Sequence, residues 1–208
     1  MENGLADITL NKDEMRLWGS LALKGIDNAM TGLATMVNRE IRMSSLSLKQ
    51  VPASDAPDLV GGADKMVIGI YLAFEGDASG HLMLVHQPDV ALAIIDILLG
   101  NEPGTTRDLN EMEQSALGEM GNIIGSSFLN AIADALDMTL KPSPPEVILD
   151  MAGAILDVAF AEILQQTDDV IVAETSFGTS DRQARGTFLV IPSYNFLKVI
   201  LSHAGVEK

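Results

Sequence analysis

The sequence predicts an α+β fold in which a sheet of about six mostly antiparallel strands carries two long amphipathic helices across one face. Apolar residues recur with helical spacing over residues 12–38 and again over residues 110–136. Hairpin-like pairs of extended segments follow each helical stretch. The elements then repeat in the same order, which indicates a pseudo-two-fold, duplicated unit. Placing both helices on one face of the sheet buries both of their apolar stripes at once.

The predicted repeat divides the chain into two halves of a single domain, over about residues 12–100 and 109–205, with a linker at 101–108. In the first half the expected elements are a helix, an extended segment, a hairpin and a closing helix: 12–38, 41–51, 66–74 with 81–85, and 89–99. The second half repeats this order: 110–136, 138–141, 169–177 with 186–191, and 194–203. Either Asp108 or Asn110 is expected to cap the second long helix, because both side chains accept hydrogen bonds from a helix N-terminus.

The halves are expected to differ at one place. Residues 150–164 have the apolar spacing of an additional helix, whereas the corresponding residues 54–63 contain proline and glycine and are expected to form a loop.

Composition limits the possible functions. With 47 % apolar residues in 208, the chain can bury a substantial core. Thirteen basic against 29 acidic residues give a net charge of −16, which disfavours nucleic acid and anionic membranes as partners, although solubility alone also explains such a charge. The absence of cysteine excludes disulfides and thiolate chemistry, and the three histidines are scattered, so we expect no metal site. No signal-like start and no long apolar run are present, so a soluble, cytoplasmic protein is expected.

The second long helix carries the most informative side chains. At about 100° per residue, Ser115, Glu119 and Asn122 fall within roughly 60° of one another. The expected buried stripe lies on the opposite side and comprises Leu117, Ile124, Phe128, Ala131 and Ala135. The exposed face therefore presents a carboxylate, which can bind a cation, beside a carboxamide, which can orient a water molecule. A solvated helix face is the simpler interpretation of the same pattern.

These residues resemble a known motif. Ser115, Glu119, Asn122 and Pro145, which follows Asn122 after 22 residues, match the pattern of the CheC/CheX/FliY family of chemotaxis phosphatases. The neighbouring stretches 117–125 and 144–151 resemble the CheC branch in particular, and the likeness extends over nearly the whole chain. The resemblance implies the duplicated CheC-like fold.

The resemblance also implies a function, which is hydrolysis of the aspartyl phosphate on a CheY-type response regulator. By this likeness Asn122 would orient the attacking water and Glu119 would pair with a lysine of the regulator. The regulator would supply the Mg²⁺, so no cofactor of the chain's own is implied. Pro145 would fix the turn after a short strand and support the helix. Ser115 either lies at the edge of the contact or is an ordinary exposed serine.

A second copy of the motif, which CheC proteins often carry on the first long helix, is degenerate here. Ser20 stands where the glutamate belongs and Leu23 where the asparagine belongs. Serine is too short to reach a distant lysine and leucine cannot hold a water molecule, so we expect this copy to be inactive. Whether it still binds a partner is left open.

Residues 150–157 resemble the part of CheC that engages CheD, a receptor deamidase. This likeness makes Asp150 a candidate partner contact, while Met151 and Ile155 are expected in the core. The alternative function is a non-catalytic adaptor or motor-switch-like module that binds phosphorylated CheY or CheD. The sequence does not indicate the oligomeric state.

Overall fold

The computed structural model describes residues 11–160, 169–179 and 183–192, together with Phe196, Val199 and Ser202. Its helices in this part of the chain are α1 (Lys12–Val37), α2 (Ala56–Leu59), α3 (Pro88–Leu98), α4 (Glu111–Leu136) and α5 (Ala152–Phe160), and a 3₁₀ turn, η1 (Ala53–Asp55), precedes α2. Its strands are β1 (Arg42–Pro52), β2 (Met66–Gly76), β3 (Gly80–His86), β4 (Leu140–Pro142), β5 (Glu146–Met151), β6 (Asp169–Gly178) and β7 (Gln183–Pro192).

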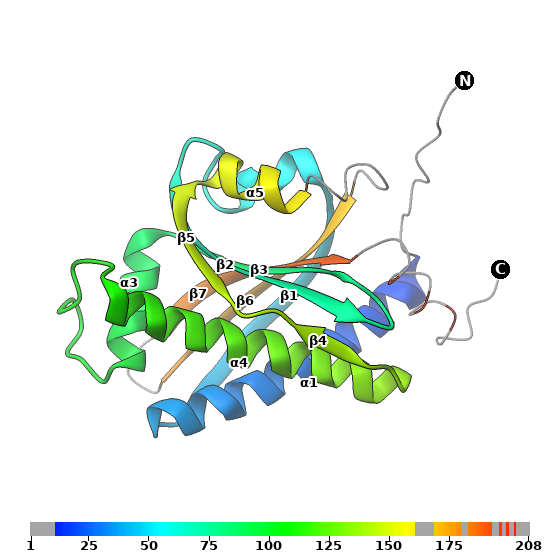
Figure 1. Cartoon of the computed structure of the whole chain (residues 1–208), viewed down its shortest axis with the longest axis horizontal. Helices are drawn as coiled ribbons and strands as arrows, with labels where there is room; N and C mark the ends of the chain where they lie inside the picture. The colour runs from blue at the N-terminus through cyan, green and yellow to red at the C-terminus, as the bar shows by residue number, and fades with distance from the viewer. Residues whose placement is uncertain are drawn as a thin grey trace.

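All the strands form one antiparallel sheet in the order β1-β6-β7-β3-β2-β4, with β5 also paired to β2. Helices α1 and α4 lie side by side across one face, whereas α5 and α2 cover part of the other (Figure 1). Strand β1 pairs with β6 from the second half of the chain, and β4 and β5 pair with β2 from the first half. The two halves therefore interleave in a single sheet, and the symmetric strand order is consistent with the predicted duplication.

The two long helices are built alike. Each has 26 residues and begins after an asparagine, which is Asn11 for α1 and Asn110 for α4. The side chain of each asparagine accepts a hydrogen bond from a backbone N–H in the first turn of its helix. Each ends at a residue in the left-handed conformation with φ of 51°, Asn38 or Asp137. The predicted helices are thus confirmed, with Asn110 rather than Asp108 as the cap. Corresponding residues of the two helices differ by 99 in number, since 110 − 11 and 137 − 38 both equal 99.

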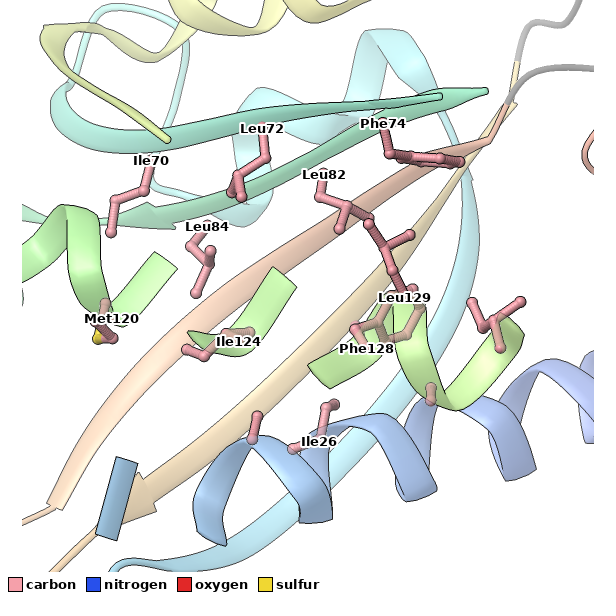
Figure 2. Packing of buried hydrophobic residues seen from close by; sticks show 14 of the residues in the cluster. Ile26, Ile70, Leu72, Phe74, Leu82, Leu84, Met120, Ile124, Phe128 and Leu129 are labelled. Atoms are coloured by element: carbon pink, nitrogen blue, oxygen red, sulfur yellow. The ribbon is translucent and has the colours of Figure 1, made fainter. Parts of the chain in front are cut away.

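The main core lies between these helices and the sheet. Ile70, Leu72 and Phe74 from β2 and Leu82 and Leu84 from β3 face the helices, as Figure 2 shows. From the helix side they meet Ile26 of α1 and, on α4, Met120, Ile124, Phe128 and Leu129. A second core lies under α5 and α2 on the other face of the sheet.

The predicted buried stripe of α4 is confirmed for Leu117, Ile124, Phe128 and Ala131. It is wrong for Ala135, which is exposed, while Leu136 is buried in its place. Leucine removes more apolar surface from water than alanine, so the last turn of α4 favours this orientation.

Three further expectations are corrected or lie outside the described residues. The predicted helix over 150–164 begins later, at Ala152, because Asp150 and Met151 belong to β5 and pair with Val67 and Met66 of β2. The sequence pattern did not indicate the strand β5, and residues 161–168 lie outside the described part of the chain.

The predicted loop 54–63 overlaps η1 and contains α2. The first residues of these two elements, Ala53 and Ala56, are buried in the second core. The predicted closing helix 194–203 also lies outside the described residues, apart from three single positions.

The segment 101–108 is held by a buried carboxylate on α3. Asp96 is 1 % exposed, and its side chain accepts hydrogen bonds from Gly104 N at 2.6 Å and from Thr106 N and Oγ1 at 2.9 and 2.6 Å. Burial raises the pKa of Asp96, but these hydrogen bonds outweigh it and hold the pKa below its ordinary value. The aspartate that interrupts the apolar run of the sequence therefore orders the connection between α3 and α4.

Candidate functional site

The four motif residues meet at one open depression on the surface beside α4. Ser115, Glu119 and Asn122 line it from the helix, and Pro145 lines it from the connection between β4 and β5. Ser115 and Glu119 are exposed and Asn122 is half-buried. Residues that complete the lining are Glu111, Gln114, Gly118, Pro142, Ser143, Pro144 and Val147. We call this surface the α4 depression.

The glycines of α4 let Pro145 and the sheet approach the helix closely. A Cβ atom added to Gly121 would lie less than 3.0 Å from Cγ2 of Ile70 and 3.7 Å from Cβ of Pro145. One added to Gly118 would lie 3.8 Å from Cγ of Pro145. Pro145 therefore packs against α4 at Gly118 and Gly121, the glycines that directly precede Glu119 and Asn122 in the sequence. Sequence reasoning missed these glycines, although a glycine inside a helix costs about 1 kcal/mol relative to alanine and implies a packing reason.

Two polar side chains of the α4 depression, those of Glu119 and Asn122, are available to another molecule. Oδ1 of Asn122 accepts a long hydrogen bond of 3.5 Å from the Ser126 hydroxyl, one turn further along α4. Within the described part of the chain, the Glu119 carboxylate has no hydrogen-bond or ion-pair partner. The depression thus offers a carboxylate, a carboxamide and a rigid proline wall to whatever docks there.

A counterpart depression lies beside α1. It is lined by Asn11, Lys12, Met15, Arg16, Gly19 and Leu48, and we call it the α1 depression. Ser20 and Leu23 lie on α1 at the positions that correspond, by the difference of 99, to Glu119 and Asn122. The Leu23 side chain is 49 % exposed. Arg16 stands where α4 has Ser115, and its guanidinium is 3.1 Å from the Asp13 carboxylate.

Asp150 lies away from the α4 depression. It is an exposed residue of β5 and not, as predicted, part of a helix, and its Oδ1 accepts a hydrogen bond of 2.7 Å from Met151 N. The expectation that Met151 is a core residue is wrong, since it is 46 % exposed, whereas Ile155 is buried as expected. Met151 is exposed because β5 forms part of the sheet edge.

Across residues 11–160, 169–179 and 183–192, no three histidine, aspartate or glutamate side chains are grouped so that they could hold a metal ion. In the same part of the chain, no helix combines the length and the hydropathy that crossing a bilayer requires.

Comparison with known proteins gives a consistent result. Residues 112–149, which contain all four motif residues, match the CheC-like family. The chain is 33 % identical over 202 residues to the CheY-P phosphatase CheC of Bacillus subtilis, covering 95 % of this chain and 97 % of that one. Its fold is similar to that of Thermotoga maritima FliY, with a TM-score of 0.76 and 18 % identity over 97 % of this chain and 100 % of that one. It is also similar to a chain of the FliG–FliM complex from H. pylori, with a TM-score of 0.67 and 15 % identity over 93 % of this chain and 100 % of that one.

Proposed function

The chain belongs to the CheC-like family, and from this premise we propose that it accelerates hydrolysis of the aspartyl phosphate on a CheY-type response regulator in chemotaxis. The observation that carries the proposal is the meeting of Glu119, Asn122 and Pro145 at the α4 depression. The name of the Bacillus subtilis relative, CheY-P phosphatase, supports the same substrate.

In this proposal Asn122 orients the attacking water. A carboxamide both donates and accepts hydrogen bonds and does not change its protonation near neutral pH. It therefore acts by holding the water in line with the phosphorus while the bond from phosphorus to the aspartyl oxygen breaks, which releases inorganic phosphate and a free carboxylate. Such positioning accounts for about a hundredfold in rate, or about 2.7 kcal/mol of barrier.

Glu119 anchors the regulator. Its exposed carboxylate has no partner among the described residues, so pairing with a lysine of the regulator breaks no existing bond. The regulator brings the acyl phosphate and the Mg²⁺ that neutralises its charge, so this chain contributes docking and orientation only. Pro145 forms the wall beside both side chains, and Ser115 lies at the rim of the contact.

The test is phosphate release from a phosphorylated CheY-type regulator in Mg²⁺, with the native chain and single variants. Asn122→Ala is expected to keep the KM and to lose about a hundredfold in kcat. Glu119→Ala is expected to raise the KM, because the docking ion pair is lost. Leu23→Ala, at the corresponding position of α1, is the matched control and is expected to behave as the native chain. Unchanged hydrolysis in both α4 variants would exclude the proposed mechanism.

A second candidate is a non-catalytic adaptor or motor-switch-like module that binds phosphorylated CheY. The first long helix favours it, because α1 also borders a surface depression and carries exposed Ser20 and Leu23 at the positions that correspond to Glu119 and Asn122. Binding of the phosphorylated regulator without faster phosphate release would identify the adaptor.

CheD is proposed as a further partner, and the cytoplasm as the compartment in which these partners meet. The support for CheD is the exposed Asp150 on β5, whose sequence neighbours Leu149 and Met151 are also exposed. Asp150→Ala is expected to weaken CheD binding while leaving phosphate release from the regulator unchanged.

A further inference from the structure

The segment that carries Pro145 is a bulge in the sheet edge. Pro142 of β4 pairs with Phe74 of β2, and Glu146 of β5 pairs with Tyr71 of the same strand. Three residues, 143–145, therefore lie opposite only two residues, 72 and 73, of β2. Such a bulge redirects the side chains of the bulged strand, and here it brings Pro145 against α4.

Ser143 fastens this bulge to β2 by two hydrogen bonds. Its backbone N–H donates to the Ala73 carbonyl at 2.8 Å, and its hydroxyl oxygen accepts the Ala73 N–H at 3.1 Å. The hydroxyl in turn donates to the Pro144 carbonyl at 3.0 Å. The two residues that follow are prolines, which have no N–H with which to continue the ladder. The serine side chain thus supplies a partner to the Ala73 N–H where the strand pairing is interrupted.

We propose that Ser143 is a positioning residue of the α4 depression, acting through Pro145 on the placement of Asn122. The chain of contacts is continuous, from Ala73 to Ser143 by hydrogen bonds, through Pro144 to Pro145, and from Pro145 to Gly121 beside Asn122. Without the hydroxyl, the Ala73 N–H loses its acceptor and Ser143 keeps only one of its two hydrogen bonds to Ala73, which lets the bulge shift relative to the helix. The proposal rests on the proposed phosphatase function.

The other half of the chain contains a matched control. Strand β1 has a one-residue register shift between Met43 and Ser45, so Ser44 is the extra residue. It stands 99 residues before Ser143, and its hydroxyl donates to the Ser176 carbonyl at 3.2 Å. Ser44 is exposed and is followed by Ser45 and Leu46 instead of two prolines. It therefore sits in the same fold position but supports no motif residue.

The experiment compares Ser143→Ala, Ser143→Thr and Ser44→Ala in phosphate release from the phosphorylated regulator, well below the unfolding temperature. We expect Ser143→Ala to lower kcat about tenfold with little change in KM, since displacement of a positioning group by a fraction of an ångström affects the rate more than docking. Ser143→Thr keeps the hydroxyl and should restore kcat to within about twofold. Ser44→Ala should leave both parameters unchanged. A Ser143→Ala variant with native kcat and only a lower unfolding temperature would overturn the proposal.

A second readout separates this inference from the phosphatase function. Amide exchange at Ala73 and the amide resonances of Gly118 and Gly121 can be followed by NMR without any regulator. We expect Ser143→Ala, but not Ser44→Ala, to accelerate exchange at Ala73 and to shift both glycine resonances. Unshifted glycine resonances would overturn the positioning role, whatever the activity. A native chain that releases no phosphate would instead refute the phosphatase function.

Discussion

The α4 depression and the α1 depression have the same construction and different chemistry. Both lie beside a 26-residue helix at a glycine that packs against an apolar side chain of a neighbouring strand: Gly118 against Val147, and Gly19 against Leu48. A Cβ atom on either glycine would meet that side chain at an ordinary distance, 3.8 Å for Gly118 and 3.7 Å for Gly19. Each depression therefore forms where a glycine lets a strand side chain approach its helix, but a proline wall borders only the α4 depression of the two.

The chemistry of the two depressions is opposite in charge. The α4 depression has Glu111 and Glu119, whereas the α1 depression has Lys12 in the place of Glu111 and Arg16 in the place of Ser115. A basic group of a partner is attracted to the first surface and repelled by the second. A few exposed side chains therefore decide which of the two surfaces attracts a basic partner.

The largest effect is expected at Gly121, where α4 lies too close to Ile70 of β2 to admit a Cβ atom, whereas α1 has Ala22 at the corresponding position. Gly121→Ala places a methyl group less than 3.0 Å from Cγ2 of Ile70, so we expect a loss of about 3 kcal/mol in the free energy of unfolding, together with a fall in kcat as α4 moves outwards. Urea unfolding and phosphate release measure the two effects. Gly19→Ala is the control, because its new Cβ meets Leu48 at 3.7 Å, and it should be neutral or stabilising by up to about 1 kcal/mol. Equal stabilities of the two variants would contradict the close approach at Gly121.

A smaller effect is expected for a carboxylate outside both depressions. Asp96→Asn removes the charge that accepts hydrogen bonds from residues 104 and 106, so we expect a loss of about 1.5 kcal/mol in unfolding free energy and unchanged kcat. Because the pKa of Asp96 is lower in the folded than in the unfolded chain, this contribution is complete above its ordinary value of 3.8 and is lost as the pH falls through the lower, folded value.

Urea unfolding of the native chain and of Asp96→Asn over a range of pH tests this contribution. The difference in unfolding free energy between the two proteins should be constant near neutral pH and should shrink below about pH 4. A difference that grows as the medium becomes more acidic would have the wrong sign for a carboxylate stabilised in its charged form.

The smallest effect is expected when the motif is transplanted. In a chain inactivated by Asn122→Ala, the double change Ser20→Glu and Leu23→Asn gives α1 the two side chains of α4. We expect at most a twofold gain in phosphate release, because Leu46 stands where Pro145 would be and Arg16 keeps a positive charge in the α1 depression. Recovery of most of the native rate would mean that two side chains suffice and that the proline wall is dispensable.

The sequence by itself determined the elements that depend on local interactions. Helical spacing located both long helices, a capping residue at 108 or 110 marked the start of the second, and the period of the helix brought Ser115, Glu119 and Asn122 to one face. These features are predictable because capping and helical periodicity act between residues only a few positions apart.

Only the tertiary structure decided what depends on distant partners. Asp150 and Met151 have a helical pattern but join β5, because β2 offers them pairing partners 83 and 85 residues away in sequence. Pro145 reaches the α4 depression because of a bulge whose register is set by β2, and Gly121 is required because Ile70 packs over it. Strand pairing and close packing join residues that no local pattern connects. The wall opposite the helix, apart from the motif residue Pro145, therefore became visible only in the folded chain.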